Sequence, residues 1–191
     1  FHYLMRLAVL LDDKGVRGAR PGALSNAGFE VVAMADHLGG FALSEFGPAT
    51  RKRLGGLLAR RRLEGIVGVK NLLDLTPIMD DAAYEEAVRA VMEDDGVDVG
   101  VIGCVPLTGA LQTVEGGPDH AEDLRHEDSV VRRLVRLHQA SPKAWVGVVD
   151  AGALYDPMVR LLEAEGIPVF RTADRALRLF GRYVAWRLAH G

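Results

Sequence analysis

Three features that often assign a protein to a class are scarce or missing in this chain. Its 191 residues include one cysteine, Cys104, so no internal disulfide can form, which is typical of a reducing, cytoplasmic compartment. Its net charge of -3 lacks the basic excess that nucleic-acid binders usually carry. No apolar run approaches the roughly 18 residues that a membrane span needs. We therefore expect a cytoplasmic protein that binds neither nucleic acid nor membrane.

Glycine and apolar residues are abundant instead. The sequence has 22 glycines and is 49% hydrophobic, whereas glycine makes up roughly 7% of an average protein. Nearly half of the residues can enter a hydrophobic core, and a chain of this length usually forms one domain. The extra glycines suit a fold with several tight corners between strands and helices.

Strand-like and helix-like patterns alternate along the chain. Short apolar runs with small residues, such as Val97 to Cys104, are typical of buried parallel strands. Amphipathic stretches with polar caps, such as Ser129 to Ala140, are typical of helices. Strands are expected at 22–24, 41–46, 97–104, 144–149 and 167–170, and helices at 28–38, 48–62, 81–91, 129–140, 156–165 and 172–184. This alternation predicts an α/β fold with a doubly wound parallel sheet.

Residues 1–19 are expected to lie outside this fold. Phe1 to Asp12 has apolar residues at the spacing of an amphipathic helix, and a loop rich in glycine, lysine and arginine follows. Because the first strand begins only at Gly22, we interpret residues 1–19 as a lead-in helix and linker from a preceding domain. Residues 20–191 then form the α/β domain.

The segment from Gly22 to Gly39 contains the first candidate site. A short strand of small residues runs into a tight corner, Ser25 to Gly28, and an apolar helix follows. This arrangement leaves the first N–H groups of the helix at the carboxyl edge of the sheet, where they can bind an anion. Taken alone, a glycine after a strand is more often simple turn punctuation. A second loop, Gly103 to Thr108, is expected at the same edge.

Glu30 falls in the first turn of that helix and bears on the anion site. A carboxylate is favoured near the positive end of a helix, but it competes with a bound anion for the same charge. Because burying it against Met34 would be costly, we expect Glu30 to point outward into solvent. The anion site is then weakened but usable.

Three stretches together resemble one enzyme family. They are N-A-G-F-E-V-V-A-M-A-D (26–36), N-L-L-D-L-T-P with the following A-x-Y-x-x-A helix (71–87), and G-I-P-V-F-R-T-A-D-R-A (166–176). In this order and spacing they are similar to the acyl-CoA synthetases that release a nucleoside diphosphate, which are relatives of succinyl-CoA synthetase. The resemblance covers about residues 20 to 187 and implies the flavodoxin-like ligase domain of these enzymes.

The resemblance implies a role in making acyl-CoA from an acid, CoA and ATP, through an acyl phosphate and a phosphorylated histidine. In this family the phosphohistidine lies between the amino-termini of two helices, and the helix that begins near Gly28 would be one of them. The two edge loops would bind the phosphohistidine or acyl phosphate, and Asn71 and Asp74 would shape the same crevice. The binding residues so implied are Asn26, Ala27, Gly28, Phe29, Gly103, Cys104, Val105, Pro106 and Thr108.

The same resemblance implies no cofactor and no metal within this domain. CoA, ATP and Mg²⁺ would serve the parent enzyme, whose phosphorylated histidine belongs to a preceding flavodoxin-like domain. The other expected partners are a CoA-binding domain, an ATP-grasp domain or subunit, and a small carboxylic acid. Because the histidine and the nucleotide site belong to those other parts, we expect the isolated domain to be inactive, and whether its parent is an active enzyme stays open.

The chain departs from the family pattern at the helix start and after Asn71. Family members often carry Asn-Ser-Gly-Gly where this chain has residues 26–29, Asn-Ala-Gly-Phe, and Leu72 replaces the usual proline. The alternative function is a non-catalytic ligand-sensing or interaction domain, for example in a fused protein acetyltransferase. A flavin mononucleotide protein is disfavoured, because the corner from Ser25 to Gly28 offers few hydroxyls for a phosphate.

The cysteine and four of the histidines could carry chemistry, but simpler interpretations are favoured. Cys104 could be a nucleophile, yet no basic partner is visible to lower its pKa, so we expect a buried, apolar role. His120 and His126 lie in a long acidic loop without compact ligand spacing, which favours a solvated loop over a metal site. His37 and His138 are expected to be partly buried residues on helix surfaces.

Overall fold

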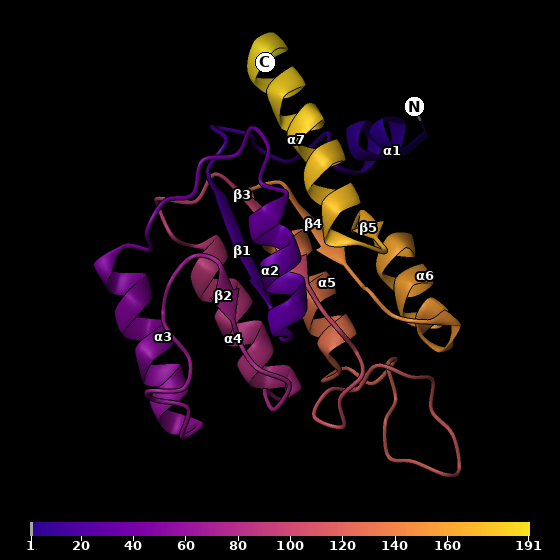
Figure 1. The fold of residues 1–191 in the computed structure, drawn as a ribbon. Coiled ribbons are helices and arrows are strands. Elements are labelled where there is room, and N and C mark those ends of the chain that lie inside the picture. The colour runs from indigo at the N-terminus through magenta and orange to yellow at the C-terminus, as the bar shows by residue number, and fades with distance from the viewer. Residues whose placement is uncertain (1) are drawn as a thin grey trace.

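The computed structural model describes residues 2–191, and at its centre is a sheet of five parallel strands (Figure 1). The strands are β1 (Pro21–Ser25), β2 (Leu73–Asp74), β3 (Val99–Gly103), β4 (Trp145–Val148) and β5 (Val169–Phe170), in the order β2-β1-β3-β4-β5. Every residue of β1, β3 and β4 is buried, which explains why these strands consist of apolar and small residues. The predicted doubly wound sheet is confirmed, and its strand order is that of flavodoxin.

Helices cover both faces of the sheet (Figure 1). On one face lie α1 (His2–Leu10), α2 (Gly28–Asp36) and α7 (Ala173–His190). On the other lie α3 (Pro48–Arg60), α4 (Asp81–Met92), α5 (Val130–Ala140) and α6 (Asp156–Ala164), the last preceded by the short 3-10 helix η1 (Ala153–Tyr155). Each layer buries its own hydrophobic cluster, with Met34 and Phe180 in the first, and Leu54, Val88 and Leu134 in the second.

The helices α5 and α7 bury the faces that their apolar spacing predicts. Leu134 of α5 is buried, as are Leu177 and Phe180 of α7. Ser129 caps α5, because its hydroxyl accepts a hydrogen bond from the N–H of Arg132 at 3.2 Å. No helix in the described part of the chain is long and apolar enough to cross a membrane.

The predicted strand at 41–46 is wrong, because these residues form an irregular segment outside the sheet. The edge of β1 is occupied instead by the short β2 and by the side chain of Asn71. The amide group of Asn71 accepts from the N–H of Ala23 at 3.1 Å and donates to the carbonyl of Pro21 at 2.7 Å. It also donates to the carbonyl of Ser44 at 3.1 Å. The Asn71 amide therefore fills the place of a backbone peptide group and separates the irregular segment from β1.

The first helix is packed into the same core as the sheet. The predicted helix begins at Phe1, which lies outside the described residues, and α1 runs to Leu10. Leu7 and Leu11 are fully buried in the cluster beneath α7. Tyr183 of α7 donates its hydroxyl to the carbonyl of Leu11 at 3.1 Å. The domain boundary after residue 19 and the preceding domain stay predictions.

Candidate functional site

The candidate site lies at the carboxyl edge of the sheet between β1 and β3, where the chain changes the direction of its winding. Asn26 follows β1 and is almost completely buried, at 1% exposure. Its side-chain amide donates to the carbonyl of Val105 at 2.9 Å and accepts from the N–H of Val105 at 2.8 Å. The loops after β1 and β3 are therefore joined, and the prediction that they share one edge is confirmed.

The amino-terminus of α2 is uncapped and carries two free amides. Ala27 occupies the cap position with an extended backbone and gives no side-chain cap. The N–H groups of Glu30 and Val31 both bond to the carbonyl of Ala27, at 3.1 and 3.2 Å. The N–H groups of Gly28 and Phe29 have no acceptor among residues 2–191, and both residues are exposed. Two donors and the positive end of the helix therefore face solvent at the switch point, an arrangement suited to an anion.

Asp74 places a carboxylate beside the first residue of α2. It ends β2, and its Oδ1 accepts from the N–H of Thr76 at 3.0 Å. A Cβ added to Gly28 would lie 2.9 Å from Asp74 Oδ2, closer than real contacts allow. Glycine at position 28 therefore lets the helix start this close to the carboxylate without displacing it. The negative charge of Asp74 opposes an anion at the same amides.

Glu30 points inward, so the prediction of an outward, solvated side chain is wrong. It is 1% exposed, and its Oε2 accepts from the hydroxyl of Ser25 at 2.5 Å. The same Ser25 hydroxyl accepts from the N–H of Ala27 at 3.1 Å. Glu30 Oε1 has no partner in the described part of the chain.

Gly103 on β3 makes the inward position of Glu30 sterically possible. A Cβ at Gly103 would lie 1.9 Å from Glu30 Oε2 and 2.8 Å from Met34 Cε. Because glycine leaves this space empty, the first turn of α2 can pack closely against the sheet. The Glu30 carboxyl then lies against Ser25 of β1 and Gly103 of β3. The space at Gly103 therefore accommodates the inward direction of Glu30.

Burial raises the pKa of Glu30 to about 7. Removal of the carboxylate from water is the largest cause, and the charge of Asp150, in the loop after β4, raises the pKa further. The hydrogen bond from Ser25 lowers it, because that bond favours the ionised form. Near neutral pH the Glu30 carboxyl is therefore divided between its neutral and charged forms.

The loop after β3 contributes backbone rather than reactive side chains. Cys104 is 2% exposed, and burial raises the pKa of its thiol, which agrees with the interpretation of a buried apolar role. Val105 and Pro106 are buried as well, so neither side chain faces a ligand. Thr108 donates its hydroxyl to the carbonyl of Pro77 and ties this loop to the one after β2.

Of the two residues predicted to shape the crevice, the structure brings one to it. Asp74 lies at the start of α2, as described above, whereas Asn71 bonds along the amino-terminal part of β1, at Pro21 and Ala23. The predicted binding residues Asn26 to Phe29 and Gly103 to Val105 are contiguous at the edge. Sequence reasoning missed the Ser25–Glu30 pair, for which the only signal was a hydroxyl and a carboxyl five residues apart across a strand–helix corner.

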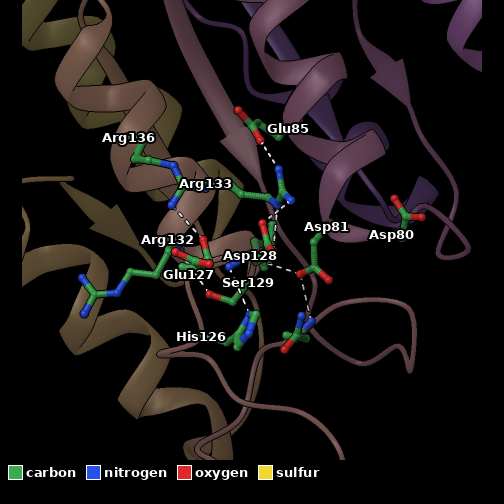
Figure 2. A network of polar contacts seen from close by, with 12 residues as sticks. Asp80, Asp81, Glu85, His126, Glu127, Asp128, Ser129, Arg132, Arg133 and Arg136 are labelled. Carbon is green, nitrogen blue, oxygen red and sulfur yellow. Dashed lines mark hydrogen bonds and ion pairs between the residues drawn. The ribbon is translucent and has the colours of Figure 1, made fainter.

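The long loop after β3 is held against α4 and α5 by a polar network (Figure 2). Arg133 of α5 forms ion pairs with Glu85 of α4 at 2.6 Å and with Asp128 of the loop at 2.7 Å. Asp81, at the start of α4, accepts from the N–H of Val130 at 2.6 Å and so caps α5. Asp128, one of the acidic residues of this loop, therefore holds the loop against α5.

The histidines of this loop are exposed, as the interpretation of a solvated loop predicts. His126 Nδ1 accepts from the N–H of Asp128 at 3.2 Å, and His120 lies at the surface. Within residues 2–191 no group of three His, Cys, Asp or Glu side chains is arranged to hold a metal ion.

His138 is more deeply buried than predicted. It is 3% exposed and packs edge-on against Trp145, with ring centroids 4.6 Å apart. Burial and the nearby charge of Lys14 lower the pKa of His138 to about 4. The imidazole therefore stays neutral at physiological pH and belongs to the core.

Comparison with known proteins reveals a shared fold. No protein-family pattern and no curated protein sequence matches the chain. Among solved structures it is similar to PH0766 from Pyrococcus horikoshii OT3, at 22% identity and a TM-score of 0.68 over 95% of this chain. It is also similar to dinucleotide forming acetyl-coenzyme A synthetase 1 of Ca. Korarchaeum cryptofilum, at 16% identity. The TM-score is 0.71 over 96% of this chain for the apo form and 0.72 over 98% for the complex with phosphate and ADP. The likeness is one of fold.

The chain spans about two fifths of the length of these structures. It covers 40% of PH0766 and 38% or 39% of the two synthetase structures. The named synthetase is the kind of enzyme that the three sequence motifs resemble. The shared fold therefore agrees with the flavodoxin-like domain that the motifs imply, and it corresponds to part of each of these longer chains.

Proposed function

We propose that the chain is a domain of an acid–CoA ligase that forms a nucleoside diphosphate, and that the amino-terminus of α2 binds a phosphoryl group. The group would belong to an acyl phosphate or a phosphohistidine. The observation that carries this proposal is the pair of free amides of Gly28 and Phe29 at the switch point between β1 and β3. Backbone donors at a helix start are favourable partners for phosphate oxygens.

Each element of the edge has a defined part in this proposal. Asn26 fixes the loop before α2 against Val105, so the two amides are held in place without a ligand. Gly28 allows the helix to begin close to β2, where Asp74 lies. Other parts of the ligase would bind CoA, ATP and Mg²⁺ and would supply the histidine. This domain would present one of two helix ends to the phosphoryl group.

A ligand-sensing or interaction domain without catalysis is the second candidate. The observation that favours it is the acidic surroundings of the amides, since Asp74 lies beside Gly28 and Glu30 belongs to the same first turn of α2. These carboxyl groups reduce the affinity for a dianion. Weak, reversible binding of a ligand is sufficient for a sensing domain, whereas a catalytic site has to stabilise a transition state tightly. Binding of a phosphoryl group is common to both candidates, so it is the property to measure first.

Titration of inorganic phosphate and acetyl phosphate into the ¹⁵N-labelled chain tests the proposal. The amide signals of Gly28 and Phe29 should shift most, and acetyl phosphate should compete with phosphate. The variant Asp74→Asn should bind about two- to fivefold more tightly, the effect of about 0.3–1 kcal/mol for a charge at a helix end. Asp36→Asn, the same change at the far end of α2, is the matched control and should leave the affinity nearly unchanged. Absence of a shift at both amides in all three proteins would refute the site.

A further inference from the structure

The buried Glu30 carboxyl belongs to the first turn of α2, and Ser25 links it to the amide of Ala27, which precedes the two free amides. The hydroxyl of Ser25 donates to Glu30 Oε2 at 2.5 Å and accepts from the N–H of Ala27 at 3.1 Å. Ala27 immediately precedes Gly28, the first of the two free amides. A charge on Glu30 therefore acts on the anion site across one side chain and one peptide group, and the Glu30 and Ser25 side chains at the start of this path are buried from water.

The ionised form of Glu30 is poorly stabilised in this position. Its Oε1 is buried without a partner, and its Oε2 has a single donor. A buried carboxylate normally needs several donors, so this one is easily displaced toward its neutral form. An unpartnered, fully buried oxygen at a helix amino-terminus distinguishes this site from an ordinary helix start.

The other groups that face Glu30 do not compensate its charge. Tyr84 of α4 donates its hydroxyl to the carbonyl of Gly103, and Cys104 follows β3 as a buried thiol. Asp150, after β4, adds a negative charge that raises the pKa of Glu30. On the α7 side, Asp174 interacts electrostatically with His37, which follows the carboxyl-terminal end of α2, and neither acts on the pKa of Glu30. None of the groups that act on the pKa of Glu30 in the described residues is a cation, and that pKa is about 7.

We propose that Glu30 is a proton switch for the anion site: when neutral it permits an anion at the amides of Gly28 and Phe29, and when ionised it repels one. This inference rests on the proposed function only in taking those amides as an anion site. It assigns to Glu30 a regulatory role in which the carboxyl does not touch the ligand. Occupancy by a phosphoryl group would then increase as the pH falls through neutrality.

Sulfate is the suitable probe, because it stays a dianion over the whole range in which phosphate changes its charge. Affinity is measured from the amide shifts of Gly28 and Phe29 at pH values from 5.5 to 8.5. Wild-type affinity should fall at least about tenfold as the pH rises, the scale expected for two charges that interact in a partly buried site. The midpoint should coincide with that of the Glu30 side-chain carboxyl, followed by ¹³C NMR in the same samples.

Two variants isolate Glu30 from other titrating groups, since histidines ordinarily titrate in this range as well. Glu30→Gln should bind sulfate with an affinity that is independent of pH. Asp150→Asn keeps the carboxyl and should move both midpoints to lower pH, because a source of repulsion is lost. Asp36→Asn should retain the wild-type midpoint.

The outcomes separate this inference from the proposed function. Sulfate binding of equal strength at all pH values, or the same pH dependence in Glu30→Gln, would overturn the switch and leave the anion site standing. No binding to wild type or Glu30→Gln at any pH would overturn the anion site, and the switch with it. A midpoint that moves with Asp150→Asn in both measurements would support the switch even if Glu30→Gln fails to fold.

Discussion

Glu30 and His138 are buried ionisable side chains that titrate in opposite senses. The folded chain holds the Glu30 proton up to about pH 7, whereas an unfolded glutamate loses it near 4.5. The folded chain keeps His138 neutral down to about pH 4, whereas an unfolded histidine takes a proton near 6.5. Each group therefore makes the free energy of unfolding depend on pH, with opposite slopes.

The contribution of Glu30 to the free energy of unfolding should fall as the pH rises from 4.5 to 7 and then level off. The folded state binds more protons than the unfolded state over this interval, which corresponds to a loss of about 3 kcal/mol. Glu30→Gln lacks this contribution, so the difference in free energy of unfolding between wild type and Glu30→Gln should fall by this amount over the same interval. Urea unfolding between pH 4.5 and 8 measures it, and parallel curves for the two proteins would contradict the burial of an ionisable Glu30.

For His138, stability should fall as the pH drops from 6.5 toward 4. The unfolded state binds the extra proton here, and the loss is again about 3 kcal/mol. Between pH 4.5 and 6.5 the two effects oppose each other, so the wild-type curve should be flatter than that of either variant. His138→Leu should lose stability steadily as the pH rises from 4.5, whereas Glu30→Gln should gain it. A steep wild-type curve in this window would show that one of the two groups is not buried.

Gly103 should be intolerant of even a methyl group because of the carboxyl above it. A Cβ there would lie 1.9 Å from Glu30 Oε2, and overpacking of this kind costs about 1–3 kcal/mol. Gly103→Ala should therefore be destabilised, and Glu30→Ala should relieve part of the cost in the double variant. Gly152→Ala, where nothing lies within 4 Å, is the control. Additive effects in the double-mutant cycle would mean that the two residues do not touch.

At the scale of elements, α1 is expected to contribute strongly to stability. Leu7 is fully buried between α1 and α7, whereas Val9 is 72% exposed on the other side of the helix. Leu7→Ala should cost about 2–5 kcal/mol, the range for a buried leucine, and Val9→Ala less than about 0.5 kcal/mol. Thermal or urea unfolding of both variants gives the comparison. Equal, small effects would indicate that α1 is a detachable lead-in.

The sequence predicts elements well where periodicity and caps coincide. Ser129 followed by apolar residues at helical spacing specifies α5, and the small, apolar residues of β3 specify a buried strand. The short β2 has no such signal, because two residues cannot show a period and the Asn71 amide supplies the rest of the pairing. The segment 41–46 shows the converse, since the Asn71 amide occupies the edge of β1 beside it and the segment does not become a strand.

The candidate site was predictable in its backbone and unpredictable in its side chains. The strand–corner–helix pattern places Asn26 and Gly28 at the edge, because parallel strands align their carboxyl ends. The direction of Glu30 depends on Gly103, a residue far away in sequence, and no local rule connects them. The proximity of Asp74 to Gly28 likewise depends on β2 lying next to β1.

At the scale of the whole molecule, we expect the chain alone neither to form acyl-CoA nor to take up label from γ-³²P-ATP. The proposed phosphoryl site consists of residues 26–29 and 103–108, which include no histidine. His37, at the other end of α2, is exposed and bonds to the carbonyl of Ala33 at 2.8 Å. Acid-labile radioactivity is the readout, and a stably labelled histidine in the purified chain would overturn the assignment of the acceptor to another domain.

The pairing of Asn26 with Val105 has a consequence for the entropy of binding. Two hydrogen bonds through a fully buried side chain hold the loops after β1 and β3 in one arrangement before any ligand arrives. A flexible loop would have to lose conformational freedom on binding, at roughly 1–2 kcal/mol for each residue ordered. Here that ordering is already complete as part of folding. Little of the free energy gained from contacts with an anion is therefore lost to ordering of the loops. Even a small anion with weak contacts should form a measurable complex.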